Sequence, residues 1–368
     1  MVAQGRFLSN FLLLFVLALA NIIVFLYFTH PTLLNLRHET PNDVLRSNQN
    51  LLDTMLSNTL DNGTVFHESK QSSESGNDKK ESQPSVNQFP IDLKKRPILA
   101  HDFKLVINHP DKCMNPDGTP AEVFLLVLIN SIHRNFEQRQ AIRDTWGNPT
   151  MVNGQRIITM FLLAKVHDDK LQALVLQENE RFGDLLMEDF DDTYMNLTLK
   201  SIMGFKWANN YCSHARYGMK TDDDMFVNYE TLVKLLIDSL DKEFAVGFLI
   251  NGSPIRDVKS KWYMSRDVYP DSKYPPFLSG TGYVMSMDVM CNTYKVALET
   301  PFLYLEDVFV AVCWNKLGIV PRKHPEFHNW KKVYSLCRYR KIITSHMVTP
   351  NEMYRIWRDM AAKKSISC

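Results

Sequence analysis

Three consecutive carboxylates, Asp222, Asp223 and Asp224, are the residues of this sequence best suited to carry chemistry. They follow residues 215–220, which have the composition of a buried strand. Carboxylate oxygens are the ligands that hard cations such as Mg²⁺ and Mn²⁺ prefer. Ligands of open α/β sheets bind at the carboxyl ends of strands. A solvated acidic turn is the alternative and, for the triplet taken alone, the more common outcome.

A second acidic pair, Glu306 and Asp307, opens the segment LEDVFVAVCWNKLG, which has the pattern of a helix ending at Gly318. Acidic residues in a first turn are stabilised by the positive end of the helix dipole, and this alone explains most of them. The functional interpretation is a general base directed at the cleft.

Basic residues elsewhere could meet an anionic substrate. Arg139 and Arg143 lie in RQAIRDTWG and could pair with diphosphate oxygens near a helix start. A surface helix with a buried Trp146 is the alternative, and the residues alone favour it. His346 ends the alternating run KIITSH and is a candidate metal ligand, although a lone histidine is more often a packed or surface residue.

Short apolar runs alternate with helical patterns along the second part of the chain. Asn135 followed by Gln138 is a helix-start signal, and Gly147 a stop. Such alternation predicts an α/β domain with a mostly parallel sheet. The expected strands are 122–130, 156–164, 215–220 and 244–249, and the expected helices are 135–147, 171–182, 197–207, 230–240 and 306–317.

The N-terminus contains an uncharged apolar run, Phe7–Phe28. About 20 apolar residues span a bilayer core as a helix. Arg6 precedes the run and no basic residue follows before Arg37, which places the short tail 1–6 in the cytosol. A cleaved signal peptide is the alternative, but the run exceeds a typical apolar region of about 7–15 residues. We therefore expect an uncleaved transmembrane signal anchor at 7–28, with everything after it in the lumen.

Residues 29–95 are rich in Ser, Asn, Gln, Glu and Lys. Such a stretch buries too little apolar surface to offset its ordering entropy, so we expect a flexible stem. The remaining residues, 96–368, form the expected catalytic domain. A formal net charge of +1 without a basic stripe argues against nucleic acid as a partner.

A lumenal domain permits disulfides and N-glycosylation. The six cysteines allow 15 full pairings, and their spacing does not select one. Sequons at Asn62 and Asn196 are candidate glycosylation sites, whereas Pro254 makes the sequon at Asn251 doubtful.

Taken together, several ordered motifs from about Phe103 to Cys368 resemble the β-1,3-glycosyltransferase family. They read RQAIRDTWG, EDFDDTYMNLTLK, KTDDDMFVN, YPPFLSGTGYVMS, EDVFV and CRYRKIITSH. The stretch before YPPF and the tail TPNEMYRIWRDMAAKK are most similar to the galactosyltransferase branch that acts on terminal β-N-acetylglucosamine. Two positions depart from the family pattern. Leu278 replaces a frequent cysteine, so that a familiar disulfide is absent or rerouted through Cys291, and Ala311 replaces a frequent glycine near the proposed base.

The resemblance implies a GT-A-type fold, a UDP-sugar donor, Mn²⁺ and inversion at the anomeric carbon. Carried over, Asp224 is the metal ligand of a DxD-type motif, with Asp222 and Asp223 on the donor side. His346 matches a late metal or diphosphate contact, and Asp307 the catalytic base. Glu306 is then expected on the acceptor side.

The expected reaction is transfer of galactose from UDP-galactose to the 3-hydroxyl of a glycan ending in β-N-acetylglucosamine, by a type II protein of the Golgi membrane. Trp262, Tyr263 and Tyr274 could stack on sugar faces or pack in the core. An N-acetylglucosaminyltransferase would share every catalytic motif, and a non-catalytic lectin-like or chaperone protein would be expected to lack the carboxylates. A homodimer is compatible with the sequence, which does not reveal the oligomeric state.

Overall fold

The structure is a computed structural model that describes residues 101–363 and 367–368. The expected tail, anchor and stem (1–6, 7–28 and 29–95) and the sequon at Asn62 lie outside these residues. Within the described part of the chain, the helices are all too short or too polar to cross a bilayer.

A mixed β-sheet lies at the centre of the described residues. Its strands, in spatial order, are β1 (Leu105–Ile107), β5 (Leu185–Asp191), β4 (Gln155–Lys165), β2 (Leu125–Asn130), β6 (Tyr217–Asp222), β9 (Phe277–Ser286), β8 (Ala245–Ile250) and β10 (Arg322–Lys323). The neighbours β5, β4, β2 and β6 pair in parallel, and β9 runs antiparallel to both β6 and β8. The α/β class is confirmed. The prediction of a mostly parallel sheet holds for β5, β4, β2 and β6 and fails at β9 and at the edge strand β1, which pairs antiparallel with β5.

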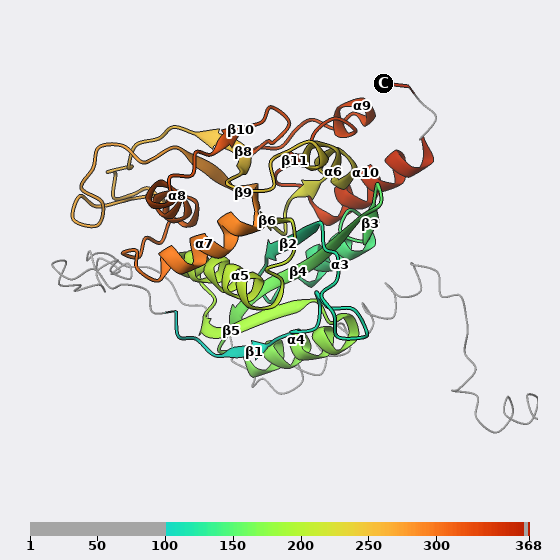
Figure 1. The fold of residues 1–368 in the computed structure, drawn as a ribbon, viewed down its shortest axis with the longest axis horizontal. Coiled ribbons are helices and arrows are strands. Elements are labelled where there is room, and N and C mark those ends of the chain that lie inside the picture. Colours follow the sequence, from blue (N-terminus) through green and yellow to red (C-terminus); the bar gives the residue numbers. More distant parts are fainter. Residues whose placement is uncertain (1–100, 364–366) are drawn as a thin grey trace, which may run out of the picture. The chain divides into compact units, whose positions relative to one another are not determined.

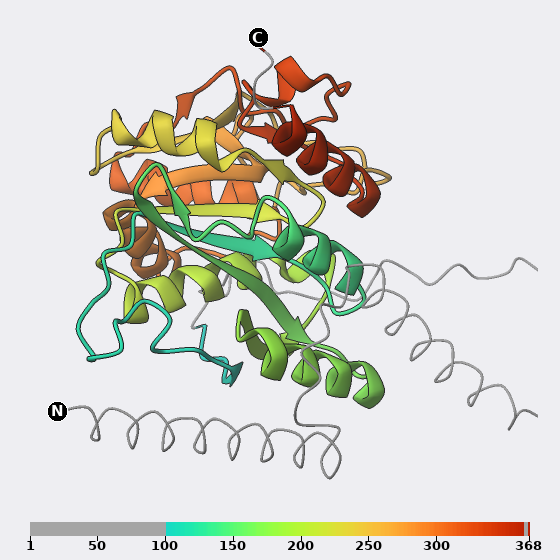
Figure 2. The same ribbon diagram turned by 90° about the vertical axis from the view of Figure 1, so that its right-hand side faces the viewer.

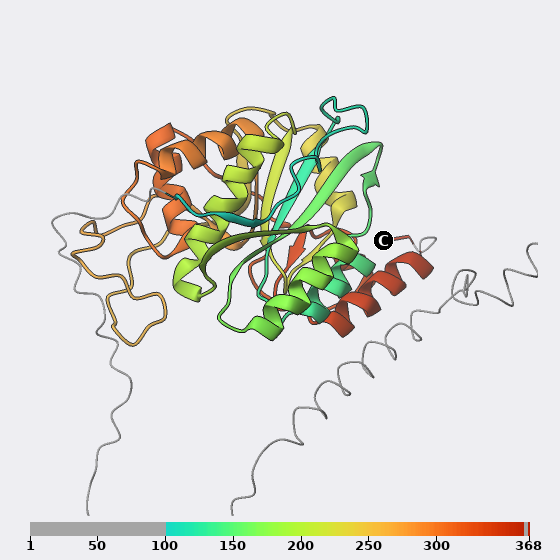
Figure 3. The same cartoon turned by 90° about the horizontal axis from the view of Figure 1, so that it is seen from below.

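Helices cover both faces of this sheet (Figures 1 and 2). Every residue of β2 is buried, as expected for a strand with covered faces. Its alternate side chains enter two separate cores. One core contains α5 (Leu197–Tyr211), α7 (Met287–Ala297) and α8 (Glu306–Leu317); the other contains α3 (Phe136–Asp144), α4 (Asp169–Phe182), α6 (Tyr229–Ile237) and α10 (Pro350–Ala362). Figure 3 shows α5 and α7 on one side of the strands, and α3, α4 and α10 on the other.

The starts of the five expected helices agree with the sequence signals, whereas α3, α5 and α6 end three or four residues from the expected positions. Helix α8 ends at Gly318, whose φ of 73° is the left-handed conformation that glycine adopts without strain. Helix α3 begins at Phe136, as predicted, but the side chain of Asn135 makes no capping hydrogen bond. Its amide Nδ2 instead donates to Asp223 Oδ2 at 2.9 Å. The supposed cap therefore serves the acidic triplet.

Several elements were not assigned from the sequence, among them β5, α7, α10 and strand β9, which reaches the site. The β9 segment contains Gly280 and Gly282, and glycine is unfavourable in strands. Gly280 is closely packed, because a Cβ there would lie 3.0 Å from Oε2 of Glu306. As β9 is antiparallel to β6 and pairs Gly282 with Thr221, it brings Gly280 to the carboxyl end of β6.

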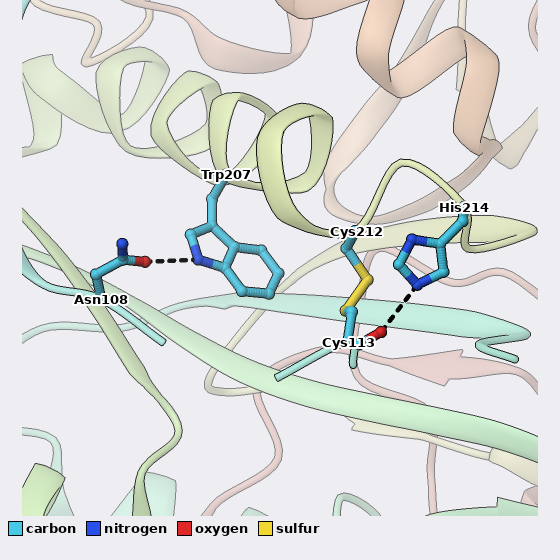
Figure 4. Close-up of a disulfide and its surroundings, with 5 residues drawn as sticks. All are labelled: Asn108, Cys113, Trp207, Cys212 and His214. Carbon is cyan, nitrogen blue, oxygen red and sulfur yellow. Dashed lines mark hydrogen bonds between the residues drawn. A yellow bond between two sulfur atoms is a disulfide. The ribbon is translucent and has the colours of Figure 1, made fainter. Parts of the chain in front are cut away.

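Two disulfides tie down peripheral segments. Cys113–Cys212 joins the loop before β2 to the end of α5, beside a hydrogen bond from Trp207 Nε1 to Asn108 Oδ1 of 2.9 Å (Figure 4). Cys337–Cys368 joins the chain end to the short helix α9 (Leu336–Tyr339).

The two remaining cysteines, Cys291 and Cys313, are buried free thiols. The rerouting of a family disulfide through Cys291 is therefore wrong, since no other cysteine pairs with it. Leu278 is itself buried in the core. The added methyl group of Ala311 is accommodated in the same core.

Candidate active site

The carboxylates predicted from the sequence gather around the carboxyl end of β6. Asp222 is the last residue of β6, and the amide of Asp223 donates to the carbonyl of Asn130 at the end of β2. The start of α8 approaches from the other side, because Gly280 of β9 contacts both Glu306 and Asp307. The triplet and the acidic pair therefore belong to one site.

Asp223 is turned inward. Its carboxylate accepts hydrogen bonds from Ser131 Oγ at 2.6 Å and Asn135 Nδ2 at 2.9 Å. Burial raises the pKa of Asp223 to about 6, against the opposing effect of these two hydrogen bonds. Asp223 thus connects the loops after β2 and β6. Both hydrogen bonds use Oδ2, so a contact between Asp223 and the sugar donor would use Oδ1.

Asp224 and His346 form the most accessible polar pair of the site. Asp224 Oδ2 lies 3.1 Å from His346 Nε2, and the two side chains are 45% and 24% exposed. The hydrogen bond with Asp224 raises the pKa of His346, although burial opposes it. His346 Nδ1 donates to the carbonyl of Asn329 at 3.2 Å, which fixes the orientation of the ring.

A two-residue strand pair brings these distant residues together. Strand β7 (Phe226–Val227) pairs antiparallel with β11 (Thr344–Ser345), so that Ser345 lies opposite Phe226. One position beyond this pair, Met225 follows opposite His346, and Asp224 is the next residue along the chain from Met225. The amide of Val348 also donates to the carbonyl of Asp224 at 2.8 Å. The alternating run KIITSH therefore contains strand β11, whose pairing with β7 places His346 beside the acidic loop.

The chemistry of this pair fits a divalent cation such as Mn²⁺. A carboxylate oxygen and an imidazole nitrogen converge from two loops, and a proton or a cation is needed between them. Among the described residues, no three His, Cys, Asp or Glu side chains gather as a complete metal cage. Cations of this class are commonly held by one or two protein ligands plus substrate phosphates. The pair is thus suited to share a cation with a bound diphosphate.

Lys220 connects the two acidic groups from within β6. Its Nζ donates to Asp222 Oδ1 at 2.7 Å and to the carbonyl oxygen of Gly280, and lies 3.7 Å from Glu306 Oε2. Its side chain is only 4% exposed. Burial lowers the pKa of Lys220, but the charges of Asp222 and Glu306 outweigh this and raise it overall. Lys220 is therefore charged. The sequence analysis did not single it out, because one basic residue inside a strand forms no recognisable motif.

Glu306 and Asp307 occupy different environments in the first turn of α8. Glu306 is buried, accepts from Tyr283 Oη at 2.6 Å and faces Lys220. Asp307 is partly exposed and accepts from the backbone amides of Gly280 at 3.2 Å and Val308 at 2.9 Å. Burial raises the pKa of Asp307, and these hydrogen bonds together with the Lys220 charge counteract the rise. Only Asp307 of the two remains accessible, although its assignment as base stays a prediction.

The arginines of α3 face the interior. The five N–H groups of Arg139 donate to Glu178 through two bonds, to Ser131 Oγ and to the carbonyls of Ile132 and His133. Arg139 is fully buried, so no N–H group remains for a diphosphate. This geometry favours the structural alternative over the predicted donor contact.

Arg143 is engaged in the same cluster. Its guanidinium makes a two-point contact with Asp184, through distances of 2.8 Å, and lies 2.7 Å from Glu178. Its side chain is 11% exposed. The neighbouring Trp146 is buried against Tyr229, as the structural alternative required.

Aromatic residues surround the approach to Asp307. Trp262 and Tyr194 are both 47% exposed. The pKa of Tyr194 is raised, first by its burial and then by the charge of Asp307, and a hydrogen bond with Trp262 opposes the rise. Tyr304 donates from its hydroxyl to the carbonyl of Tyr263 and so anchors the Trp262 loop. Tyr274 is different, because it is buried and packs against Tyr269 with ring centroids 4.9 Å apart.

Tyr194 was missed because it lies in an irregular stretch, the 3₁₀ helix η1 (Tyr194–Asn196), without a periodic pattern. The sequon residue that follows, Asn196, is half-buried and donates from Nδ2 to the carbonyl of Asp191 at 2.8 Å. The hydroxyl of Thr198 is buried and donates to the carbonyl of Leu303. Glycosylation of Asn196 stays a prediction.

Comparisons with known proteins agree on one family. The profile described as Galactosyltransferase matches residues 137–325. The chain is 50% identical over 279 residues to beta-1,3-galactosyltransferase 1 of Homo sapiens, covering 75% of this chain and 84% of the relative. It is 41% identical over 279 residues to beta-1,3-galactosyltransferase 2 of Homo sapiens, covering 73% of this chain and 65% of the relative. Among solved structures, the galactosyltransferase LgtC in complex with donor and acceptor sugar analogues has a TM-score of 0.34 to this chain at 11% identity. The match covers 66% of this chain and 97% of LgtC, and the likeness is distant.

Proposed function

Because this chain belongs to the galactosyltransferase family, among the β-1,3-galactosyltransferases, we propose that it transfers galactose from UDP-galactose to the 3-hydroxyl of a terminal β-linked N-acetylglucosamine. The observation that carries the proposal is the 50% identity to beta-1,3-galactosyltransferase 1 over 75% of the chain. The family itself implies a nucleotide-sugar donor and a glycan acceptor. The donor sugar, the acceptor, the GT-A-type fold and the inverting course are parts of the proposal.

On the donor side, Asp224 and His346 would hold Mn²⁺, and Asp222 and Asp223 would shape the loop beneath the nucleotide. The ion would act as a Lewis acid toward the departing diphosphate. The support is the 3.1 Å approach of the Asp224 carboxylate to a histidine ring whose other nitrogen is held by a carbonyl. An ion held by such a half-exposed pair would have room for oxygen atoms of a substrate as further ligands.

On the acceptor side, Asp307 would take the proton of the attacking 3-hydroxyl. The acceptor oxygen then forms a bond to the anomeric carbon of galactose while the bond from that carbon to UDP breaks, and UDP leaves with the bonding electrons. The proton passes from Asp307 to solvent after the product departs. Attack from the face opposite UDP inverts the anomeric centre and needs no covalent intermediate. The amides of Gly280 and Val308 fix the carboxylate for this role.

Tyr194 and Trp262 are suited to orient the acceptor sugar beside Asp307. Both rings are about half exposed, and the Trp262 loop is anchored through the Tyr304 hydroxyl. An aromatic face can cover the apolar face of a pyranose, and a phenol can donate to its hydroxyls. Tyr263 contributes its carbonyl to the anchor.

We also place the protein in the Golgi membrane as a single-pass type II protein with a lumenal catalytic domain. The apolar run Phe7–Phe28 and the single Arg6 before it motivate this topology. Protease applied to intact microsomes is expected to spare the bulk of the chain. Digestion of the catalytic domain in sealed vesicles would contradict it.

The decisive test of the activity is linkage analysis of the product that the full-length chain makes from a panel of sugar donors and acceptors. We expect a β-1,3-linked galactose on N-acetylglucosamine acceptors, made from UDP-galactose and dependent on Mn²⁺. Transfer of N-acetylglucosamine to galactose would replace the proposed donor. Absence of transfer from every donor, with UDP still bound, would indicate a non-catalytic role.

A further inference from the structure

Lys220 lies between the two halves of the site. It is a buried residue of β6, and its ammonium group contacts Asp222 Oδ1 at 2.7 Å on the donor side. On the base side it donates to the carbonyl of Gly280 and lies 3.7 Å from Glu306 Oε2. One cation therefore joins the acidic loop of β6 to the first turn of α8.

Gly280 transmits this contact to Asp307. Its carbonyl accepts from Lys220, and its own amide donates to Asp307 Oδ2 at 3.2 Å. A side chain at position 280 would collide with this arrangement, because its Cβ would lie 3.0 Å from Glu306 Oε2. The lysine thus fixes the backbone residue that fixes the carboxylate, and it need not touch substrate.

Apart from Lys220, the charged groups around Asp307 disfavour its ionised form. The titratable groups that interact with it come from α8, β6, β9, η1 and the loop before β9, namely Glu306, Lys220, Tyr283, Tyr194 and Tyr274. Asp222 lies behind Lys220, whose Nζ it contacts at 2.7 Å. Lys220 is the one cation in this set, whereas Glu306 and Asp222 carry negative charge when ionised. Burial already raises the pKa of Asp307, and loss of that cation would remove one of the effects that oppose the rise.

We propose that Lys220 is a positioning residue that keeps the base Asp307 ionised and in place, and that it couples the base to the donor-binding loop through Asp222. This inference rests on the proposed function, because it takes Asp307 as the base. A buried lysine would thereby influence the rate of the reaction without contacting the substrate. A purely structural lysine would affect folding and donor affinity but not the ionisation of Asp307.

The test is the pH dependence of kcat with saturating UDP-galactose and acceptor, measured on the full-length chain. We expect Lys220→Met to move the acidic limb to higher pH by about one unit, because loss of a nearby opposite charge raises a carboxylate pKa. Lys220→Arg keeps the charge and is expected to retain the limb near its original position. If Lys220→Met does not fold, Lys220→Gln serves as the second neutral variant.

Glu306 needs a control, since its own protonation after loss of Lys220 would partly compensate at Asp307. We therefore repeat the comparison with Lys220 and Lys220→Met in a Glu306→Gln background, where only one of the two α8 carboxylates can titrate. The shift is expected to be at least as large there. Calorimetry of UDP binding in each variant separates the effect on Asp222 from the effect on kcat.

The outcomes separate this inference from the function on which it rests. Near-normal turnover in Asp307→Asn would overturn Asp307 as the base. A strong loss in Asp307→Asn together with an unshifted limb in Lys220→Met would leave the base in place and overturn the role of Lys220. An equal shift in Lys220→Arg and Lys220→Met would also overturn it, because the charge would then not be the cause.

Discussion

Two charged clusters of this protein contain similar side chains and differ in how their charges are satisfied. In the cluster of α3 and α4, Arg139 and Arg143 meet Glu178 and Asp184 through short, mutually saturating contacts. At the carboxyl end of β6, the His346 ring is the one charged side-chain contact of the Asp224 carboxylate within residues 101–363 and 367–368, at 3.1 Å, and both side chains are partly exposed. The first cluster has completed its bonding internally, and the second retains capacity for an external ion.

The difference shows why charge and position along the chain are weak guides to a binding role. Arginines at a helix after the first buried strand matched an anion-binding pattern, yet their donors are directed into the protein. A buried charge is tolerated only when its partners are complete, which leaves nothing for a ligand. The useful criterion is remaining hydrogen-bonding and coordination capacity, and it requires the fold.

The strongest test of this contrast is Asp224→Ala. We expect loss of metal-dependent UDP binding and of measurable transfer, because one of the two proposed protein ligands for the ion is removed while the fold is retained. Calorimetry of UDP with Mn²⁺ measures the binding. Asp238→Ala, at an exposed carboxylate that ends α6, is the matched control and should bind normally. Unchanged metal-dependent affinity in folded Asp224→Ala would remove this residue from the site.

The next test concerns the two adjacent carboxylates of α8. Asp307→Asn preserves size and should lower kcat by about 10²–10⁴-fold with donor affinity retained, as expected for loss of a general base. Glu306→Gln should keep much more turnover, because Glu306 is buried against Tyr283 and Lys220. The measurement is steady-state kinetics with UDP calorimetry. Reversed effects in the two variants would exchange their roles.

Removing a saturated charge should damage stability and spare binding. Arg139→Met leaves the buried Glu178 with Arg143 as its remaining cationic partner. It also removes the donors to Ser131 and to two backbone carbonyls, and is expected to cost about 3–5 kcal/mol of unfolding free energy. Denaturant unfolding measures this cost, and the double variant with Glu178→Gln should recover part of it. The folded fraction of Arg139→Met should bind UDP with little change in Kd. A large loss of UDP affinity without loss of stability would restore the donor contact predicted from the sequence.

The smallest effect is expected at the aromatic residues near Asp307. Trp262→Ala should raise the acceptor KM by about 2- to 10-fold, because an aromatic contact contributes about 0.5–1.5 kcal/mol beyond its area. The donor KM should stay constant. Tyr274→Phe is the matched control, because its buried hydroxyl lacks a hydrogen-bond partner among the described residues. Equal changes in the donor and acceptor KM for Trp262→Ala would argue against an acceptor contact.

Much of the fold could be predicted from local patterns. The strands β2 and β4 contain apolar runs, and α8 carries both a start and a stop signal, so local patterns were sufficient to find them. Strand β9 could not be found in this way, because Gly280 and Gly282 are unfavourable in a strand, and Gly280 is packed closely against Glu306. Its antiparallel pairing with β6 and β8 was therefore not predicted.

The site was predicted as residue types but not as partnerships. The acidic triplet and the α8 pair were identified, and Asp307 is the more accessible of the pair. The pairing of Asp224 with His346 depends on β7 and β11, which are two residues each and too short to give a periodic signal. The direction of the Arg139 guanidinium is set by Glu178 on the neighbouring helix, a contact that no local pattern contains.

The strand pair that joins Asp224 to His346 has a consequence for biosynthesis. The two residues are separated by 122 positions (346 − 224), so the ribosome makes the acidic loop well before its histidine. At about 5–20 residues per second, the interval is roughly 6–24 s. Through that time the nascent chain carries the carboxylate without its partner. The growing polypeptide therefore forms the Asp224–His346 pair only after the segment carrying β11 has been synthesised.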